Sequence, residues 1–164
     1  MIKKADFTAE EWRCIVSAPP MVGMAVAAAS PSGPVGTVKE MVALGKALEE
    51  VAERGSSDGL ISAVVADLKA RVTPPAAPQE RIASAAAAKE HALSQLRKTS
   101  EILFRKVSAA EGEEYKRWLV ILAERVAEAA KEGSVLGFGG ELVSDEERSA
   151  IRQIAFALGL PATE

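Results

Sequence analysis

Cysteine and histidine each occur only once in this chain of 164 residues, as Cys14 and His91. A single cysteine excludes an intrachain disulfide and a zinc site built from several thiolates. A single histidine excludes a metal site of paired histidines, although it leaves a lone general base open. We therefore expect Cys14 to be a buried, inert thiol. We expect His91 to be a solvated surface side chain rather than a catalytic one.

An excess of charge of one sign is also absent, because 20 basic and 23 acidic residues give a formal net charge of -3. Such a chain has no overall field that attracts a polyanion, so we expect no nucleic-acid partner. Near the start of the chain, Asp6, Glu10 and Glu11 interrupt the stretch where a secretion signal needs its apolar core. We therefore expect a cytoplasmic protein.

Long hydrophobic runs are missing as well. Residues 14–38 carry no charged side chain, but Pro19, Pro20 and the turn cluster at residues 30–36 interrupt them. The continuous apolar part, residues 21–29, is shorter than the roughly 20 residues that a membrane-spanning helix needs, so we expect no transmembrane segment. Because proline lacks the amide proton and its ring clashes with the preceding turn, we expect the first helix to end or kink at the prolines. Residues 21–29 then form a second, buried helix.

Aromatic residues make up only 4% of the chain, whereas hydrophobic residues make up 48% and alanine is abundant. Small side chains let helices approach closely, and this composition favours helices over sheets. The sequence therefore predicts one all-α domain over residues 1–164, a compact bundle of about six or seven helices. Residues 10–12 and 24–29 faintly match residues 113–115 and 124–129. Two degenerate helical-hairpin repeats are therefore an alternative to a bundle of unrelated helices.

The first helix has a strong start signal. The Thr8 side chain is placed to cap the backbone amide of Glu11, and the Glu11 carboxylate is placed to reach back to Thr8. Phe7, just before the cap, is placed to pack against Trp12. We therefore expect this helix to begin directly after Thr8 and to carry Trp12 on its buried side.

Further helices follow from apolar residues spaced three and four apart. They cover residues 37–51, 60–68, 79–110 and 115–129. A proline-rich connection at residues 73–78 separates two halves of the chain, because it cannot continue a helix. A polar break at residues 111–114 separates the last two of these helices. The longest pattern, residues 79–110, resembles a heptad seam, so a homodimeric helix contact is an alternative to packing within the bundle.

The last helix is bounded by a serine-to-glutamate capping box and a glycine stop. Ser144 and Glu147 have the spacing with which each side chain bonds the backbone amide of the other residue. Asp145 and Glu146 lie in the first turn, where the helix dipole favours negative charge. Gly159 follows the last apolar residues of the pattern, as expected for a helix end.

Two candidate sites lie on the loop before this helix. The acidic residues Glu132, Glu141, Asp145 and Glu146 are candidate ligands for a divalent cation, although Asp145 and Glu146 already have a role near the helix start. The second candidate is a partner-binding segment within the loop. It consists of Gly137, Phe138, Gly139 and Gly140. No lysine with a serine or threonine follows these glycines at the spacing of a phosphate-binding loop.

The C-terminal hairpin carries the one family resemblance. Residues 126–133 end a helix, residues 143–147 open another, and Ile151, Ile154 and residues 157–160 complete it. This arrangement resembles the tellurite-resistance TerB-like helical family, with a glutamate where that family has an aspartate and with a longer glycine-rich loop. The resemblance implies a compact all-helical bacterial domain that serves stress-related membrane or protein assemblies. The resemblance does not imply a catalytic activity.

The absence of a recognisable nucleophile, base or cofactor motif favours a helical protein-interaction module without catalytic activity and without a cofactor. Its partner would be another protein or a second copy of the chain. The alternative is a TerB-like domain that binds a divalent cation through the acidic hairpin. A third hypothesis is an enzyme whose site forms between subunits and uses His91.

Overall fold

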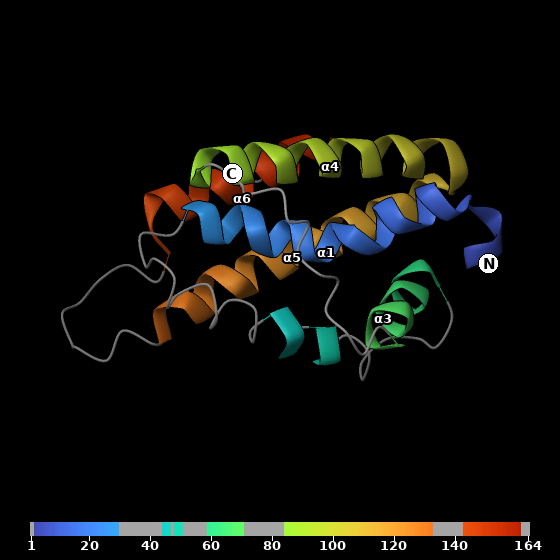
Figure 1. The fold of residues 1–164 in the computed structure, drawn as a ribbon, viewed down its shortest axis with the longest axis horizontal. Helices are drawn as coiled ribbons and strands as arrows, with labels where there is room; N and C mark the ends of the chain where they lie inside the picture. Colours follow the sequence, from blue (N-terminus) through green and yellow to red (C-terminus); the bar gives the residue numbers. More distant parts are fainter. Residues whose placement is uncertain are drawn as a thin grey trace.

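The chain folds as a bundle of helices, as seen in a computed structural model that describes residues 2–29, 44–46, 48–50, 59–70, 84–132 and 143–161. The described residues form helices and no strand (Figure 1). The elements are η1 (Lys4–Asp6), α1 (Ala9–Ala29), α3 (Leu60–Ala70), α4 (Ala85–Lys106), α5 (Ala109–Glu132) and α6 (Asp145–Ala157). Residues 44–46 and 48–50 are also helical. This confirms the predicted all-α class, whereas the proline-rich connection at residues 73–78 lies outside the described residues.

Helix α1 is the central element of the bundle. It packs against α3, α4, α5 and α6, with α4 running alongside it and α5 crossing it (Figure 1). Nine of its residues are buried.

Within the described ranges, α1 is also the helix that is long and apolar enough to cross a membrane by length and composition, and half of its most apolar window is buried in the protein. The expectation that the chain has no transmembrane segment stays a prediction.

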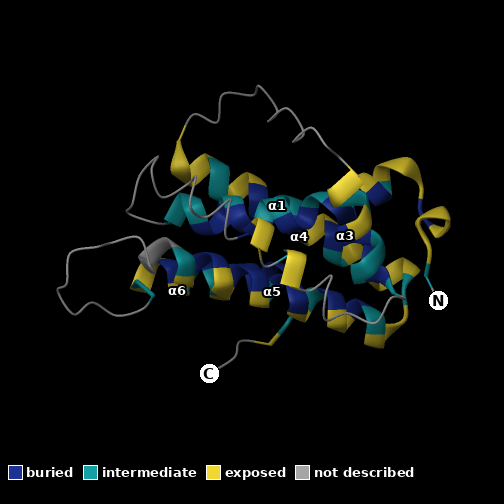
Figure 2. Cartoon of the chain, turned by 90° about the horizontal axis from the view of Figure 1, so that it is seen from below, coloured by how far each residue is buried: buried dark blue, intermediate teal, exposed yellow. Residues whose placement is uncertain are grey.

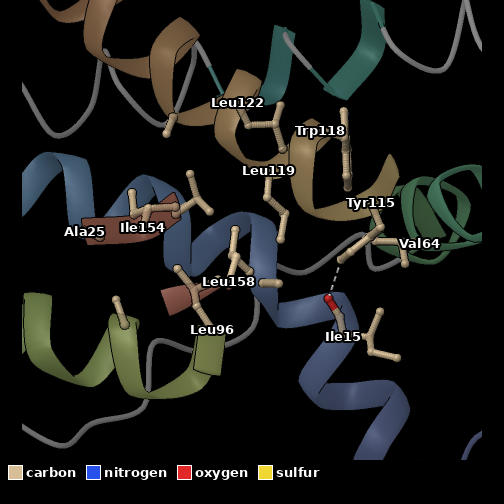
Figure 3. Close-up of a cluster of buried hydrophobic side chains, with 14 of the residues drawn as sticks. Ile15, Ala25, Val64, Leu96, Tyr115, Trp118, Leu119, Leu122, Ile154 and Leu158 are labelled. Atoms are coloured by element: carbon tan, nitrogen blue, oxygen red, sulfur yellow. Dashed lines mark hydrogen bonds between the residues drawn. The ribbon is translucent and has the colours of Figure 1, made fainter. Parts of the chain in front are cut away.

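The expectation that Pro19 and Pro20 separate two helices is wrong, because α1 continues through both prolines to Ala29. Proline at position 19 cannot donate a backbone hydrogen bond to the carbonyl of Ile15. The phenolic hydroxyl of Tyr115 donates to that carbonyl instead, at 2.8 Å (Figure 3). A buried carbonyl needs a donor, and α5 supplies one from 100 residues further along the chain.

The predicted start of the first helix is confirmed. The Glu11 amide donates to the Thr8 hydroxyl at 3.2 Å, and the Thr8 amide donates to the Glu11 carboxylate at 2.9 Å. The rings of Phe7 and Trp12 lie 5.7 Å apart between centroids, and both side chains are buried. The cap and the aromatic contact together define where α1 enters the core.

The boundary between α4 and α5 differs from the expectation. The pattern predicted a helix to residue 110 and a break at residues 111–114, whereas α4 ends at Lys106 and α5 begins at Ala109. The reason is a second serine-to-glutamate cap. The Glu111 amide donates to the Ser108 hydroxyl at 3.3 Å, and this hydroxyl donates to the Glu111 carboxylate at 2.8 Å. The charged residues at 111–114, which were expected to interrupt the helices, therefore belong to the first turns of α5.

The last helix has the predicted ends. Ser144 and Glu147 form the reciprocal capping box, with bonds of 3.2 Å and 3.0 Å. Gly159 has a φ of +72°, the left-handed conformation that glycine adopts with little strain. The amides of Gly159 and Leu160 return to carbonyls of the last turn of α6. In addition, the Ser100 hydroxyl on α4 donates to the Leu158 carbonyl at 2.9 Å, which joins the two helices.

The core fills the space between α1 and the other helices. Figure 2 shows buried residues along α1 and α5, with intermediate residues on the outer side of α1 and exposed residues on the outer side of α5. Figure 3 shows side chains from several helices meeting in one cluster. Its largest fully buried members include Ile15, Leu96, Tyr115, Leu119, Leu122, Ile154 and Leu158. Since both halves of α1 are buried in this one core, its packing keeps the proline-containing helix continuous.

We predict that the Tyr115 hydroxyl replaces the helical bond that Pro19 removes. Tyr115→Phe should lower the free energy of unfolding by about 1–2 kcal/mol, because it leaves the buried Ile15 carbonyl without its donor. In a Pro19→Ala background the restored amide at position 19 can bond that carbonyl. The same tyrosine substitution should then cost about 1 kcal/mol less. Urea denaturation of the four proteins measures this coupling, and equal costs in both backgrounds would contradict it.

Candidate functional site

An open groove with a volume of about 940 Å³ lies between the first half of α1 and α4. Helix α1 contributes Cys14, Ser17 and Met21 to its lining, and α4 contributes Gln95 and Ile102. The lining therefore combines apolar surface with polar groups. Both walls are helices whose opposite faces are buried in the core, so the groove has firm sides.

A row of basic side chains follows one wall of the groove. His91, Lys98 and Arg105 stand seven residues apart on α4, line the groove and are exposed. Residues at this spacing fall on nearly the same line along a helix. The row spans 14 residues, which corresponds to about 21 Å. Arg13 lines the groove from α1, and its Nε donates to the Ala9 carbonyl at 3.2 Å.

Three carboxylates also line the groove, but one of them is already engaged. The Glu11 carboxylate accepts the Thr8 amide and lies 3.6 Å from the Lys106 ammonium. The Thr8 amide, and after it the charge of Lys106, lower the pKa of Glu11. Glu10 and Glu101 complete the acidic lining. The groove therefore presents interspersed charges rather than a field of one sign.

The basic residues of α4 divide into two groups that the sequence did not distinguish. Arg97 lies 3.0 Å from the carboxylate of Glu90 on the same helix, and Lys106 pairs with Glu11 of α1. Lys98 and Arg105 line the groove. A helical pattern identifies these residues as charged and exposed, but only the position of α1 decides which of them face the groove.

Cys14 and His91 line the same groove, although they are 77 positions apart in the chain. His91 is exposed, as expected, whereas Cys14, which we expected to be buried, is only partly buried. Its Sγ lies 3.5 Å from the Thr99 hydroxyl and 3.9 Å from the Gln95 carbonyl. Neither neighbour is a base that activates a thiol. These contacts make the thiol part of the groove wall.

The proposed acidic metal ligands are brought together only in part. Asp145 and Glu146 lie exposed in the first turn of α6, and Arg148 lies 3.4 Å from the Asp145 carboxylate. Glu132 is the last residue of α5, while its side chain and the whole of Glu141 lie outside the described residues. The described part of the chain contains no group of three or more side chains suited to hold a metal ion. The described acids of this hairpin act at the start of α6.

The predicted partner-binding segment, made of Gly137, Phe138, Gly139 and Gly140, lies outside the described residues.

Two other phenylalanines are exposed instead of buried. The helical spacing predicts four aromatic core anchors, namely Trp12, Phe104, Tyr115 and Trp118. Phe104 on α4 is instead 87% exposed, and Phe156 on α6 is 81% exposed. Phe104 lies beside a shallow hollow lined also by Ser100 and Lys116. Periodicity alone missed this exposure, because Phe104 directly follows the buried Leu103 on α4.

The remaining aromatic anchors are buried, as expected. Trp12, Tyr115 and Trp118 lie in the core, and the Tyr115 and Trp118 rings are 5.4 Å apart between centroids. The indole N–H groups of both tryptophans have no hydrogen-bond partner among the described residues. Burial raises the pKa of Tyr115 well above its ordinary value, so its hydroxyl stays a donor. These rings therefore serve the core rather than the groove.

No protein-family model, curated protein or solved structure matches this chain. The resemblance of the C-terminal hairpin to the TerB-like family therefore stays a prediction.

We predict that the acids at the start of α6 differ in their structural roles. Glu147 is only 2% exposed and completes the cap, whereas Glu146 is exposed. Glu147→Ala should lower the free energy of unfolding by about 1–2 kcal/mol, because it removes the reciprocal bond to the Ser144 amide. Glu146→Ala is the matched control and should change it by less than about 0.5 kcal/mol. Thermal and urea unfolding measure both values, and equal effects would contradict the assignment.

Proposed function

We propose that the chain is a helical protein-interaction module without catalytic activity, and that the groove between α1 and α4 is its binding face. The observation that carries this proposal is the groove itself, an open site of about 940 Å³ with a basic row along one wall. A groove of this kind fits a segment of another protein better than a small molecule, because small-molecule sites are more enclosed.

The chemistry of the lining supports binding rather than catalysis. One common way to activate a nucleophile is a base within hydrogen-bond reach. The thiol of Cys14 contacts a hydroxyl and a carbonyl, and neither takes up a proton at neutral pH. The charges of Lys98, Arg105 and Glu101 instead lie along the rim, where they select and orient a partner.

The C-terminal hairpin supports a narrower version of the proposal. Its capped helix and glycine stop resemble the TerB-like family, which suggests a cytoplasmic module of a stress-related assembly. In this version the bundle presents the groove, while the hairpin holds α6 against α4 and α5. The resemblance supports the proposed cellular setting of the module, and the groove supports its proposed binding of a partner.

Site-directed photocrosslinking tests the proposal. Glu101→p-benzoylphenylalanine places the probe on the groove, and Arg152→p-benzoylphenylalanine places it on the exposed side of α6 as a matched control. In the native cell, the groove probe should give a discrete adduct with one protein, and the control probe should not. The adduct should be lost when Lys98→Glu and Arg105→Glu are introduced. Identical adducts at both positions, or saturable turnover of a metabolite by the purified protein, would overturn the proposal.

A further inference from the structure

We infer that the groove binds an acidic, amphipathic α-helix of about four turns, supplied by a partner protein. This inference rests on the proposed function and names the chemistry of the partner. It follows from three properties of the groove, namely its length, its distribution of charge and its apolar surface.

The length and volume of the groove match a helix. The basic row from His91 to Arg105 extends over about 21 Å, which is about four turns of an α-helix. A cylinder of that length and about 10 Å width has a volume of about 1,600 Å³. The groove volume of about 940 Å³ is of the same order, and because the groove is open, a helix that lies in it keeps one side in solvent.

The two walls run in opposite directions, and this gives the groove two different ends. Glu11 of α1 pairs with Lys106 near the end of α4, whereas Cys14 contacts Thr99, about two turns earlier in α4. Glu10 and Arg13 therefore lie toward the Arg105 end. Pro20 and Met21, further along α1, lie toward the His91 end. Charged and apolar side chains therefore alternate along the groove, with Glu10, Arg13 and Arg105 at one end and Pro20, Met21 and His91 at the other.

This distribution specifies the partner helix. Acidic residues seven positions apart lie on one line of a helix, so they can face Lys98 and Arg105 together. Apolar residues on the adjacent stripe can cover Met21, Ile102 and Leu68. Such a combination of apolar anchors and complementary charge is how helices are recognised in grooves.

Nucleic acid fits the same surface poorly. A phosphate backbone carries negative charge along its whole length, and the groove holds Glu10 and Glu101 among its basic residues. The chain as a whole carries a net charge of -3. A protein helix can place neutral residues opposite these carboxylates and acids opposite the lysine and arginine, so it avoids the repulsion.

Designed peptides test the inference directly. An alanine-based 16-residue peptide carries two glutamates seven apart and a leucine stripe, and a second peptide has lysines in place of the glutamates. Fluorescence anisotropy should show the acidic peptide binding at least about tenfold more tightly, since a tenfold ratio corresponds to about 1.4 kcal/mol. Equal binding of both peptides, no binding of the acidic one, or equally tight binding of single-stranded DNA would overturn the inference.

Charge reversal of the wall supplies the matching test. The double variant Lys98→Glu and Arg105→Glu should prefer the lysine peptide, which a merely destabilised protein would not do. The control double variant Arg117→Glu and Arg152→Glu makes the same charge change on exposed positions of α5 and α6 and should bind as the original protein does. Circular dichroism checks that all variants are folded. Equal loss of acidic-peptide binding in both double variants would contradict the inference.

The oligomeric state distinguishes a second copy of the chain from a separate partner. Light scattering should show the same mass for the original protein and for the double variant Lys98→Glu and Arg105→Glu. A dimer that dissociates in this variant would overturn the inference.

A crosslinked adduct at position 101 that carries no acidic helix would overturn the inference while leaving the proposed function intact. Absence of any adduct together with tight binding of the acidic peptide would support the helix-binding chemistry and count against the proposed cellular function.

Discussion

The bond from the Tyr115 hydroxyl to the Ile15 carbonyl is the interaction on which the centre of the bundle depends. Helix α1 carries Pro19 through the core, and a proline leaves the carbonyl four residues earlier without its helical donor. An unsatisfied carbonyl in the core costs about 1–3 kcal/mol. Tyr115 provides the donor from α5, and its ring fills the space beside α1 (Figure 3). One side chain therefore joins two helices and supplies the donor that Pro19 removes from α1.

The continuity of α1 has a direct consequence for the groove. Its first half contributes Cys14 and Ser17 to the lining, while Pro20 and Met21 extend the same wall past the proline pair. Two separate helices meeting at the prolines would have changed the direction of this wall at its midpoint. Because α1 stays one helix beside α4, the groove keeps a length that suits a bound helix. The proposed binding function thus depends on a packing contact between α1 and α5.

Acidic residues have different roles in different parts of the molecule. Glu11, Glu111 and Glu147 all complete helix starts through bonds to a serine or threonine three residues earlier or to its amide. Glu10 and Glu101 line the groove and make its charge mixed. The distinction is physical, because a carboxylate three residues after a serine or threonine has a local partner, whereas the others depend on which helices pack beside them.

The sequence by itself determined the all-helical class and the features that act within one or two turns. The caps at Thr8 and Ser144 and the glycine stop at Gly159 were all readable, since each involves neighbours three to five residues apart. The cap at Ser108 carried the same signal and was missed because the charged run after it suggested a break. Only the tertiary structure decided that α1 passes through its prolines, and that α4 residues 91, 98 and 105 face α1 across a groove. Those outcomes depend on contacts between segments about 80 to 100 residues apart, and no local spacing encodes such contacts.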